Sequence, residues 1–204
     1  EKGDDYSILI EEFRPFFYME VSDNWSITTK IQFLDHIKQK IGAKFKDSIV
    51  DCKIIKRERL YGFDNHKEYK FIFMRFKNTI AMNRVKNLFY MEKYDKDDPS
   101  IKEWKLKPNG YRFKNTNMRL YETNIPPLLR YFHIKDISPS GWVSINKKHL
   151  KKSFDTNTNC KYEYTVNYRN VIPLKNKETH VPYKICSFDI EASSSHGDFP
   201  LAVK

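Results

Sequence analysis

Two acidic residues near the end of the chain, Asp189 and Glu191, have a spacing that suits a metal-binding pair. They overlap an apolar run, Ile185, Cys186 and Phe188, which is typical of a short buried β-strand. Since successive side chains of a strand point to opposite faces, both carboxylates would lie on one face, about 7 Å apart along the backbone. Hard divalent cations prefer oxygen ligands, and two ions about 4 Å apart can share a carboxylate. The pattern therefore predicts a site for metal-assisted phosphoryl transfer.

A salt bridge is the alternative role for these carboxylates. An unpaired charge on a buried strand is very costly, so each acid needs either a metal ion or a basic partner. The spacing alone does not decide between a metal site and a salt-bridged strand end. The loop that follows contains Ala192, Ser193 and His196. For His196 we expect a hydrogen bond within the loop rather than metal ligation.

The composition is that of a folded, basic protein. The 204 residues carry a formal net charge of +11, and 40% of them are hydrophobic. The positive charge favours a polyanionic partner such as nucleic acid, and the apolar content is sufficient for a core. One or two domains are expected. No apolar run reaches the roughly 18 residues of a membrane span, so we expect no membrane partner.

The cysteines predict neither a disulfide framework nor a zinc site. Cys52, Cys160 and Cys186 are far apart and form no CxxC pair. We expect reduced, buried thiols in an intracellular protein. The polar, acidic start has none of the features of a signal peptide, and we expect the chain to be part of a longer protein.

Residues 1–120 have the pattern of an α+β domain. Strand-like segments alternate with two amphipathic helical segments, one ending at Gly42 and one capped by Asn78. The expected strands are 8–10, 16–19, 49–60, 69–76 and 119–121, and the expected helices are 29–41, with a capping box from Thr29 to Gln32, and the segment after Asn78 that buries Ala81, Val85, Leu88 and Phe89. The order β-α-β-β-α-β is that of a ferredoxin-like unit.

Phe71 and Phe73 lie in the apolar strand expected at 69–76. The ferredoxin-like architecture also serves RNA-recognition modules, in which exposed aromatic side chains of the sheet stack on bases. A strand with apolar residues on both faces is more typical of the inside of a sheet. We therefore expect both phenylalanines to be core residues, with base stacking as the alternative.

Residues 121–180 are expected to connect this domain to a following one. Asn124 and two prolines predict a helix start, and four apolar residues at i, i+3, i+4 and i+7 predict its buried face. These four are Ile125, Leu128, Leu129 and Phe132. A strand is expected at 142–145, and a half-buried strand is expected where Tyr162, Tyr164, Val166 and Tyr168 alternate with polar residues.

A basic run lies between these two strands. Its lysines are Lys147, Lys148, Lys151 and Lys152. They could contact a phosphate backbone, where each lysine adds salt-sensitive affinity. A solvated loop is the alternative.

Three stretches together resemble family B DNA polymerases. The segment from Ser187 to Glu191, followed by Gly-Asp-Phe-Pro at 197–200, resembles the first exonuclease motif of that family, in the delta-like branch that includes large DNA viruses. The run Phe13–Tyr18 is similar to the N-terminal domain of these enzymes. Residues 121–143 are similar to the segment that precedes the exonuclease motif. The three stretches occur in the same order as in the family.

The resemblance implies a site and its ligands. It implies that Asp189 and Glu191 bind two divalent ions, Mg²⁺ or Mn²⁺, of a 3′–5′ proofreading exonuclease. Ala192 and Ser193 would lie where the backbone approaches the terminal nucleotide. The implied partners are DNA, as a primer–template with a single-stranded 3′ end, the rest of the polymerase chain and a sliding clamp. An intracellular location is implied, in the host nucleus or a viral factory.

The resemblance also implies an α+β architecture in three parts. Residues 1–120 would form a ferredoxin-like or mixed N-terminal domain, and 121–180 a connection of helix and strands. Residues 181–204 would start a ribonuclease-H-like exonuclease domain with its first strand. Because the family uses further catalytic residues from later motifs, we expect this chain alone to be inactive. The alternative functions are a non-enzymatic nucleic-acid-binding module of ferredoxin-like fold and, for 1–120, a purely structural piece.

Overall fold

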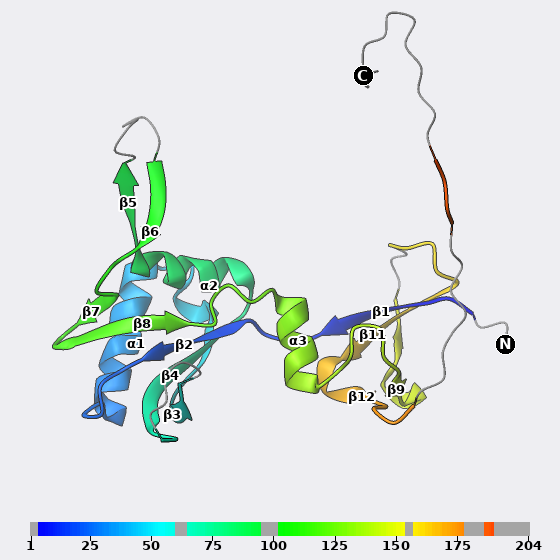
Figure 1. Cartoon of the computed structure of the whole chain (residues 1–204), viewed down its shortest axis with the longest axis horizontal. Helices are drawn as coiled ribbons and strands as arrows, with labels where there is room; N and C mark the ends of the chain where they lie inside the picture. Colours follow the sequence, from blue (N-terminus) through cyan, green and yellow to red (C-terminus); the bar gives the residue numbers. More distant parts are fainter. Residues whose placement is uncertain (1–3, 60–64, 95–101, 154–156, 178–185, 190–204) are drawn as a thin grey trace, which may run out of the picture. The chain divides into compact units, whose positions relative to one another are not determined.

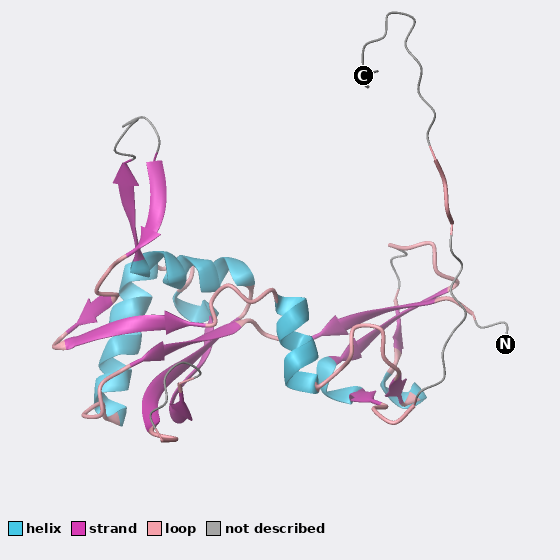
Figure 2. Ribbon diagram, in the orientation of Figure 1, coloured by secondary structure: helices cyan, strands magenta, loops and turns pink. Residues whose placement is uncertain are grey.

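The computed structural model describes residues 4–59, 65–94, 102–153, 157–177 and 186–189. Within these residues the chain is a mixture of helices and a larger number of strands, so the predicted α+β class is confirmed (Figures 1 and 2). The chain divides into two compact units, Glu1–Leu174 and Lys175–Lys204. None of the described helices is long and apolar enough to cross a membrane.

Strands supply most of the regular structure of the first unit. They are β1 (Tyr6–Glu11), β2 (Phe16–Glu20), β3 (Ile49–Glu58), β4 (Glu68–Phe76), β5 (Tyr90–Tyr94), β6 (Lys102–Leu106), β7 (Tyr111–Phe113), β8 (Thr116–Tyr121), β9 (Val143–Ile145), β10 (Lys151–Lys152), β11 (Tyr162–Asn167) and β12 (Val171–Pro173). The α-helices are α1 (Ile27–Ile41), α2 (Thr79–Lys86) and α3 (Pro127–Lys135). Single 3₁₀ turns occur at Lys46–Ser48, Asn87–Phe89, Lys147–His149 and Tyr168–Asn170.

A five-stranded antiparallel sheet forms the centre of the predicted N-terminal domain. Its strand order is β3-β4-β2-β8-β7. The path β2-α1-β3-β4-α2-β8 gives the strand order of a ferredoxin-like unit, so this prediction is confirmed. The β5–β6 hairpin is inserted between α2 and β7 (Figure 1).

Local sequence determines where α1 begins and ends. The side chain of Ser26 accepts a hydrogen bond from the backbone N–H of Thr29, at 3.2 Å, and caps the helix. The prediction that Thr29 starts the helix was therefore three residues late. Gly42 ends the helix with φ of 86°, a conformation that glycine adopts without steric cost. This stop was predicted.

The start of α2 was also predicted. The Asn78 side chain accepts a hydrogen bond from the backbone N–H of Ala81, at 2.9 Å. Val85 and Phe89 are buried beneath the helix and its final turn. An Asn cap of this kind satisfies one of the backbone donors that a helix start leaves without an intrahelical partner.

The hydrophobic core lies between α1, α2 and one face of the sheet (Figure 2). Alternate residues of each central strand point into it, as the two-residue repeat of a strand requires. Its buried residues are Phe17, Met19, Val21, Trp25, Phe33, Ile37, Ile41, Ile72, Met74, Phe76, Ala81, Met82, Val85, Phe89, Tyr111 and Met118. The opposite side of the sheet, which we call the outer face, has no helix of this core on it.

A smaller sheet joins the start of the unit to its end. β1 pairs in parallel with β11, and β10 pairs with β11 in antiparallel fashion. Tyr6 stacks on Tyr162 with ring centroids 4.9 Å apart. β9 and β12 form a separate antiparallel pair. The predicted strand at 142–145 is thereby confirmed. The strand predicted from Tyr162 to Tyr168 is confirmed as far as Asn167, with Val166 buried, but Tyr168 begins a 3₁₀ turn.

The predicted buried face of α3 is wrong for its two leucines, whereas Ile125 and Phe132 are half-buried. Leu128 and Leu129 are 63% and 43% exposed, whereas Arg130 and Tyr131 are buried. Tyr131 packs edge-on against Phe13, with centroids 5.2 Å apart. The inward face of the helix is therefore the one that carries Arg130 and Tyr131, because Phe13 offers Tyr131 an aromatic partner. No described residue covers the two leucines.

Candidate functional site

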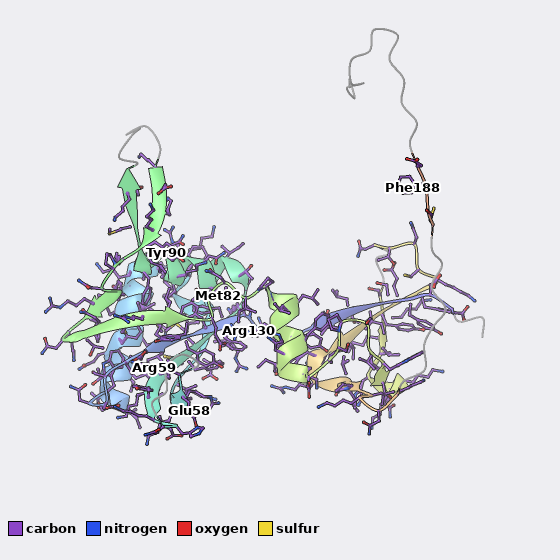
Figure 3. The ribbon with its side chains drawn as sticks, in the orientation of Figure 1. Glu58, Arg59, Met82, Tyr90, Arg130 and Phe188 are labelled. Atoms are coloured by element: carbon purple, nitrogen blue, oxygen red, sulfur yellow. The ribbon has the colours of Figure 1, made fainter. Side chains whose placement is uncertain are left out.

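Asp189 is the part of the predicted metal pair that the structure describes. Residues 186–189 form neither a helix nor a strand, and all four are exposed. Phe188, expected in a core, is 79% exposed (Figure 3). The prediction of a buried strand is therefore wrong for this segment. A strand is held by hydrogen bonds to neighbouring strands, and no strand within the described residues pairs with 186–189.

The other residues of the predicted metal site lie outside the described part of the chain. These are Glu191, Ala192, Ser193 and His196. The exposed Asp189 carboxylate is a hard oxygen donor of the type that Mg²⁺ and Mn²⁺ accept, so the chemistry of this donor fits. Within the described ranges, no cluster of three or more His, Cys, Asp or Glu side chains is placed to hold a metal ion.

The basic run lies in the 3₁₀ turn Lys147–His149 and in strand β10 of the smaller sheet. Its four lysines are exposed: Lys147, Lys148, Lys151 and Lys152. Two of them, Lys148 and Lys151, line a hollow that also contains Glu11 and Glu12, so acidic neighbours offset part of their charge. The exposure suits contact with a phosphate backbone and equally suits a solvated surface.

The expectation that all thiols are buried is only partly confirmed. All three cysteines are free thiols. Cys52 lies against the core, where burial raises the pKa of its thiol to about 11. Cys160 is half-buried and Cys186 is exposed.

Sequence spacing did not reveal the polar network on the outer face of the sheet. Glu20, at the end of β2, accepts hydrogen bonds from the guanidinium of Arg59, one at 3.2 Å, and from the hydroxyl of Tyr121 at 2.5 Å. Burial would raise the pKa of Glu20, but the bonds from Arg59 and Tyr121 outweigh it, so the pKa lies below its ordinary value. The Arg59 guanidinium also lies 3.8 Å from the centroid of the Tyr69 ring.

Two hollows adjoin this network. The first, about 230 Å³, is lined by Tyr18, Arg57, Glu58, Arg59, Phe71, Tyr121 and Glu122. The second, about 300 Å³, is lined by Glu20, Arg59, Asn109, Asn117 and Arg119. Phe71 is buried and Phe73 half-buried, but both point to the outer face rather than into the core beneath the helices. The prediction that both side chains are shielded from solvent is thus confirmed, but the prediction that they belong to the main core is wrong.

The comparisons with known proteins agree in pointing to DNA polymerases. The family described as DNA polymerase family B, exonuclease domain, matches residues 118–204. The DNA polymerase of Phaeocystis pouchetii virus is 46% identical over 202 residues, which are 99% of this chain and 19% of that protein. The DNA polymerase of Acanthamoeba polyphaga mimivirus is 30% identical over 212 residues, 99% of this chain and 11% of that protein.

A cellular relative extends the similarity. The DNA polymerase delta catalytic subunit of Schizosaccharomyces pombe is 24% identical over 205 residues, 98% of this chain and 17% of that protein. These matches cover both the ferredoxin-like unit and the acidic motif. Residues 118–204 thus match the exonuclease domain of DNA polymerase family B, and nearly the whole chain is similar to viral and cellular DNA polymerases. The chain spans between 11% and 19% of the length of these three relatives.

Proposed function

We propose that this chain is a segment of a DNA-directed DNA polymerase that contains the start of its 3′–5′ proofreading exonuclease. The observation that carries the proposal is the match of residues 118–204 to the exonuclease domain of family B, a stretch that includes Asp189 and Glu191. The viral and cellular polymerase relatives support it.

The two acidic residues would hold Mg²⁺ or Mn²⁺. Bound divalent ions would supply Lewis-acid activation of a water molecule and stabilise the leaving 3′ oxygen. Ala192 and Ser193 would face the terminal nucleotide. The DNA partner would enter as a single-stranded 3′ end, and a sliding clamp remains a proposed partner of the whole enzyme.

Asp189→Ala with Glu191→Ala in the full-length polymerase tests the proposal. Loss of metal ligation should lower the rate of 3′ trimming by about 100-fold or more, since metal ions contribute several kcal/mol to such reactions. DNA affinity and primer extension should stay nearly unchanged. The measurement is the shortening of a 5′-labelled single strand, with and without Mg²⁺.

Asp47→Ala is the matched control, because Asp47 is an exposed acid in a 3₁₀ turn of the other unit. Trimming that survives the double substitution, or that falls equally in the control, would refute the metal role. The 204-residue chain alone should not trim the oligonucleotide, because it lacks the later motifs. Robust trimming by this chain would show that its catalytic set is complete.

A further inference from the structure

The outer face of the five-stranded sheet combines aromatic rings with cationic side chains. Phe17 and Met19 of β2 enter the core, so Tyr18 and Glu20 between and beside them face outward. By the same alternation, and by their pairing with β2, Phe71 of β4 and Tyr121 of β8 lie on this face. Phe71 and Tyr121 meet edge to face, with ring centroids 5.3 Å apart.

The two hollows of this face are linked by one side chain. Arg59 lines both of them, and its Glu20 partner in the second hollow also accepts the hydrogen bond from Tyr121 in the first. Figure 3 labels Glu58, the last residue of β3, and Arg59, the residue after it. The first hollow combines three aromatic side chains with four charged ones, and the second is lined by polar side chains. A ligand that spans both therefore needs a flat apolar part and a polar part.

We propose that the two hollows form a binding site for one nucleotide. The base lies in the first hollow against Tyr18, Phe71 and Tyr121, and the phosphate lies in the second against Arg119 and Arg59. Stacking on aromatic rings suits any base, and a guanidinium donates to phosphate oxygens in a charge-assisted geometry. This site is separate from the acidic motif and does not depend on the proposed exonuclease.

Polar groups on the rim of the first hollow complement the edge of a base. Arg57 offers donors, and the carboxylates of Glu58 and Glu122 offer acceptors. A nucleobase presents both kinds of group along its edges. Glu58 already pairs with His66 and Glu122 with Arg130, so each carboxylate would offer a base only its remaining lone pairs. Asn109 and Asn117 add amide donors beside the phosphate position in the second hollow.

Arg59 is held in position before any ligand arrives. The Glu20 carboxylate fixes its guanidinium on one side, and the Tyr69 ring lies 3.8 Å from it on another. Less side-chain freedom is then lost when a ligand binds. The Glu20 carboxylate lines the same hollow and offsets one of its two guanidinium charges, so the attraction for the phosphate comes from the charge that remains on Arg59 and Arg119 together.

The volumes limit the ligand to a single nucleotide. Hollows of about 230 and 300 Å³ lie at the small end of the roughly 300–1,000 Å³ range of ligand pockets. The shared chemistry is a base with an attached phosphate. Its source is either a free nucleotide or one unstacked unit of a single strand, and the test distinguishes the two.

Saturation-transfer NMR on the 204-residue chain measures the affinity for the four deoxynucleoside monophosphates, for the matching nucleosides and for a short single-stranded oligonucleotide. Arg119→Gln should lower the affinity for the monophosphates by about tenfold, because a charge-assisted hydrogen bond to the phosphate is lost. The affinity for the nucleosides should not change. Arg57→Gln should lower the affinity for monophosphates and nucleosides alike, because Arg57 would contact the base.

Arg112→Gln is the matched control. Arg112 is an exposed arginine of β7 that lines neither hollow, and like Arg119 it alternates with core residues, so it faces outward. Its substitution should change none of the affinities. An oligonucleotide that binds at least tenfold more tightly than the monophosphates, with the same dependence on Arg119, identifies a strand as the source. Equal affinities identify a free nucleotide.

Two results would overturn the site. One is that no nucleotide binds more tightly than about 10 mM. The other is that Arg112→Gln weakens binding as much as Arg119→Gln does, which indicates only diffuse attraction. The same titrations on Asp189→Ala with Glu191→Ala should be unaltered, so failure of this site and failure of the exonuclease proposal are distinguishable.

Discussion

Glu20 shows how one carboxylate organises side chains from three strands. It lies at the end of β2. Its partner Arg59 directly follows β3, and its partner Tyr121 ends β8. Its side chain is 17% exposed, so the charge is held mostly away from water. A carboxylate in such a position contributes to stability only while its partners satisfy it.

Glu20→Gln should lower the free energy of unfolding by about 1–3 kcal/mol at neutral pH, since Arg59 loses its charged partner. The folded pKa of Glu20 lies below the ordinary value of 4.5, so its contribution is complete above that pH and is lost as the pH falls through the folded pKa. The difference between the wild type and the variant should therefore narrow below pH 4.5. Urea unfolding at a series of pH values measures it.

Glu68→Gln is the control for this effect. Glu68 is an exposed residue of β4 whose ion-pair partner, Lys56, is 3.9 Å away. Its loss should change stability by less than about 0.5 kcal/mol at every pH. A Glu20→Gln effect that stays constant on acidification would show that the carboxylate charge is not what stabilises the network.

At the scale of elements, the turn that leads into the β7–β8 hairpin depends on Gly110. This residue has φ of 68°, and an added Cβ would lie 1.9 Å from the carbonyl oxygen of Met118. Gly110→Ala should therefore cost more than the roughly 1–2 kcal/mol of a left-handed conformation, because backbone atoms must also move. Thermal or urea unfolding of the chain measures the loss.

Gly42→Ala separates the two causes. Gly42 also has positive φ, 86°, but its added Cβ would meet nothing within 4 Å. The Gly42→Ala variant should lose only the stability that corresponds to the cost of holding alanine at positive φ. Equal losses at the two glycines would mean that the contact with Met118 relaxes without cost.

The sequence predicted the position of helices and strands better than it predicted which of their side chains are buried. Asn78 and Gly42 were identified as a helix start and a helix stop because capping depends on the residue itself. Ser26 and Thr29 are both good caps, so the first turn of α1 was placed three residues late. For α3 the apolar repeat predicted the helix but not its packing, since Tyr131 had an aromatic partner in Phe13, which also contacts Tyr168.

The two candidate sites also differ in how far the sequence could predict them. Asp189 and Glu191 were found from the sequence because a pair two residues apart has a recognisable spacing. Arg59 and Tyr121 are separated from Glu20 by 39 and 101 residues along the chain, and only the pairing of β2 with β4 and β8 brings them together. No local pattern carries such a relation.

For the whole molecule, the net charge of +11 predicts salt-sensitive binding of single-stranded DNA. Changing Lys147, Lys148, Lys151 and Lys152 to glutamine should weaken this binding and make its salt dependence shallower, by about 0.7 in the logarithmic slope for each phosphate that the protein no longer neutralises. Fluorescence anisotropy with a labelled oligonucleotide over a range of salt concentrations measures both.

The control is a second set of four exposed lysines away from the basic run. These are Lys40, Lys44, Lys46 and Lys67. Their replacement removes the same charge, so an equal change in slope would show that total charge alone matters. A change confined to the first set would identify the basic run as a contact surface.

The parallel pairing of β1 with β11 has a consequence for synthesis on the ribosome. The residue opposite Tyr6 is Tyr162, so β1 emerges long before its partner exists. At about 5–20 residues per second the wait is roughly 8–30 s. All strands of the ferredoxin-like unit are made during this time and can fold first. Strand β1 is therefore among the last parts of this unit to reach its native place, and until then its unpaired edge is open to chaperones.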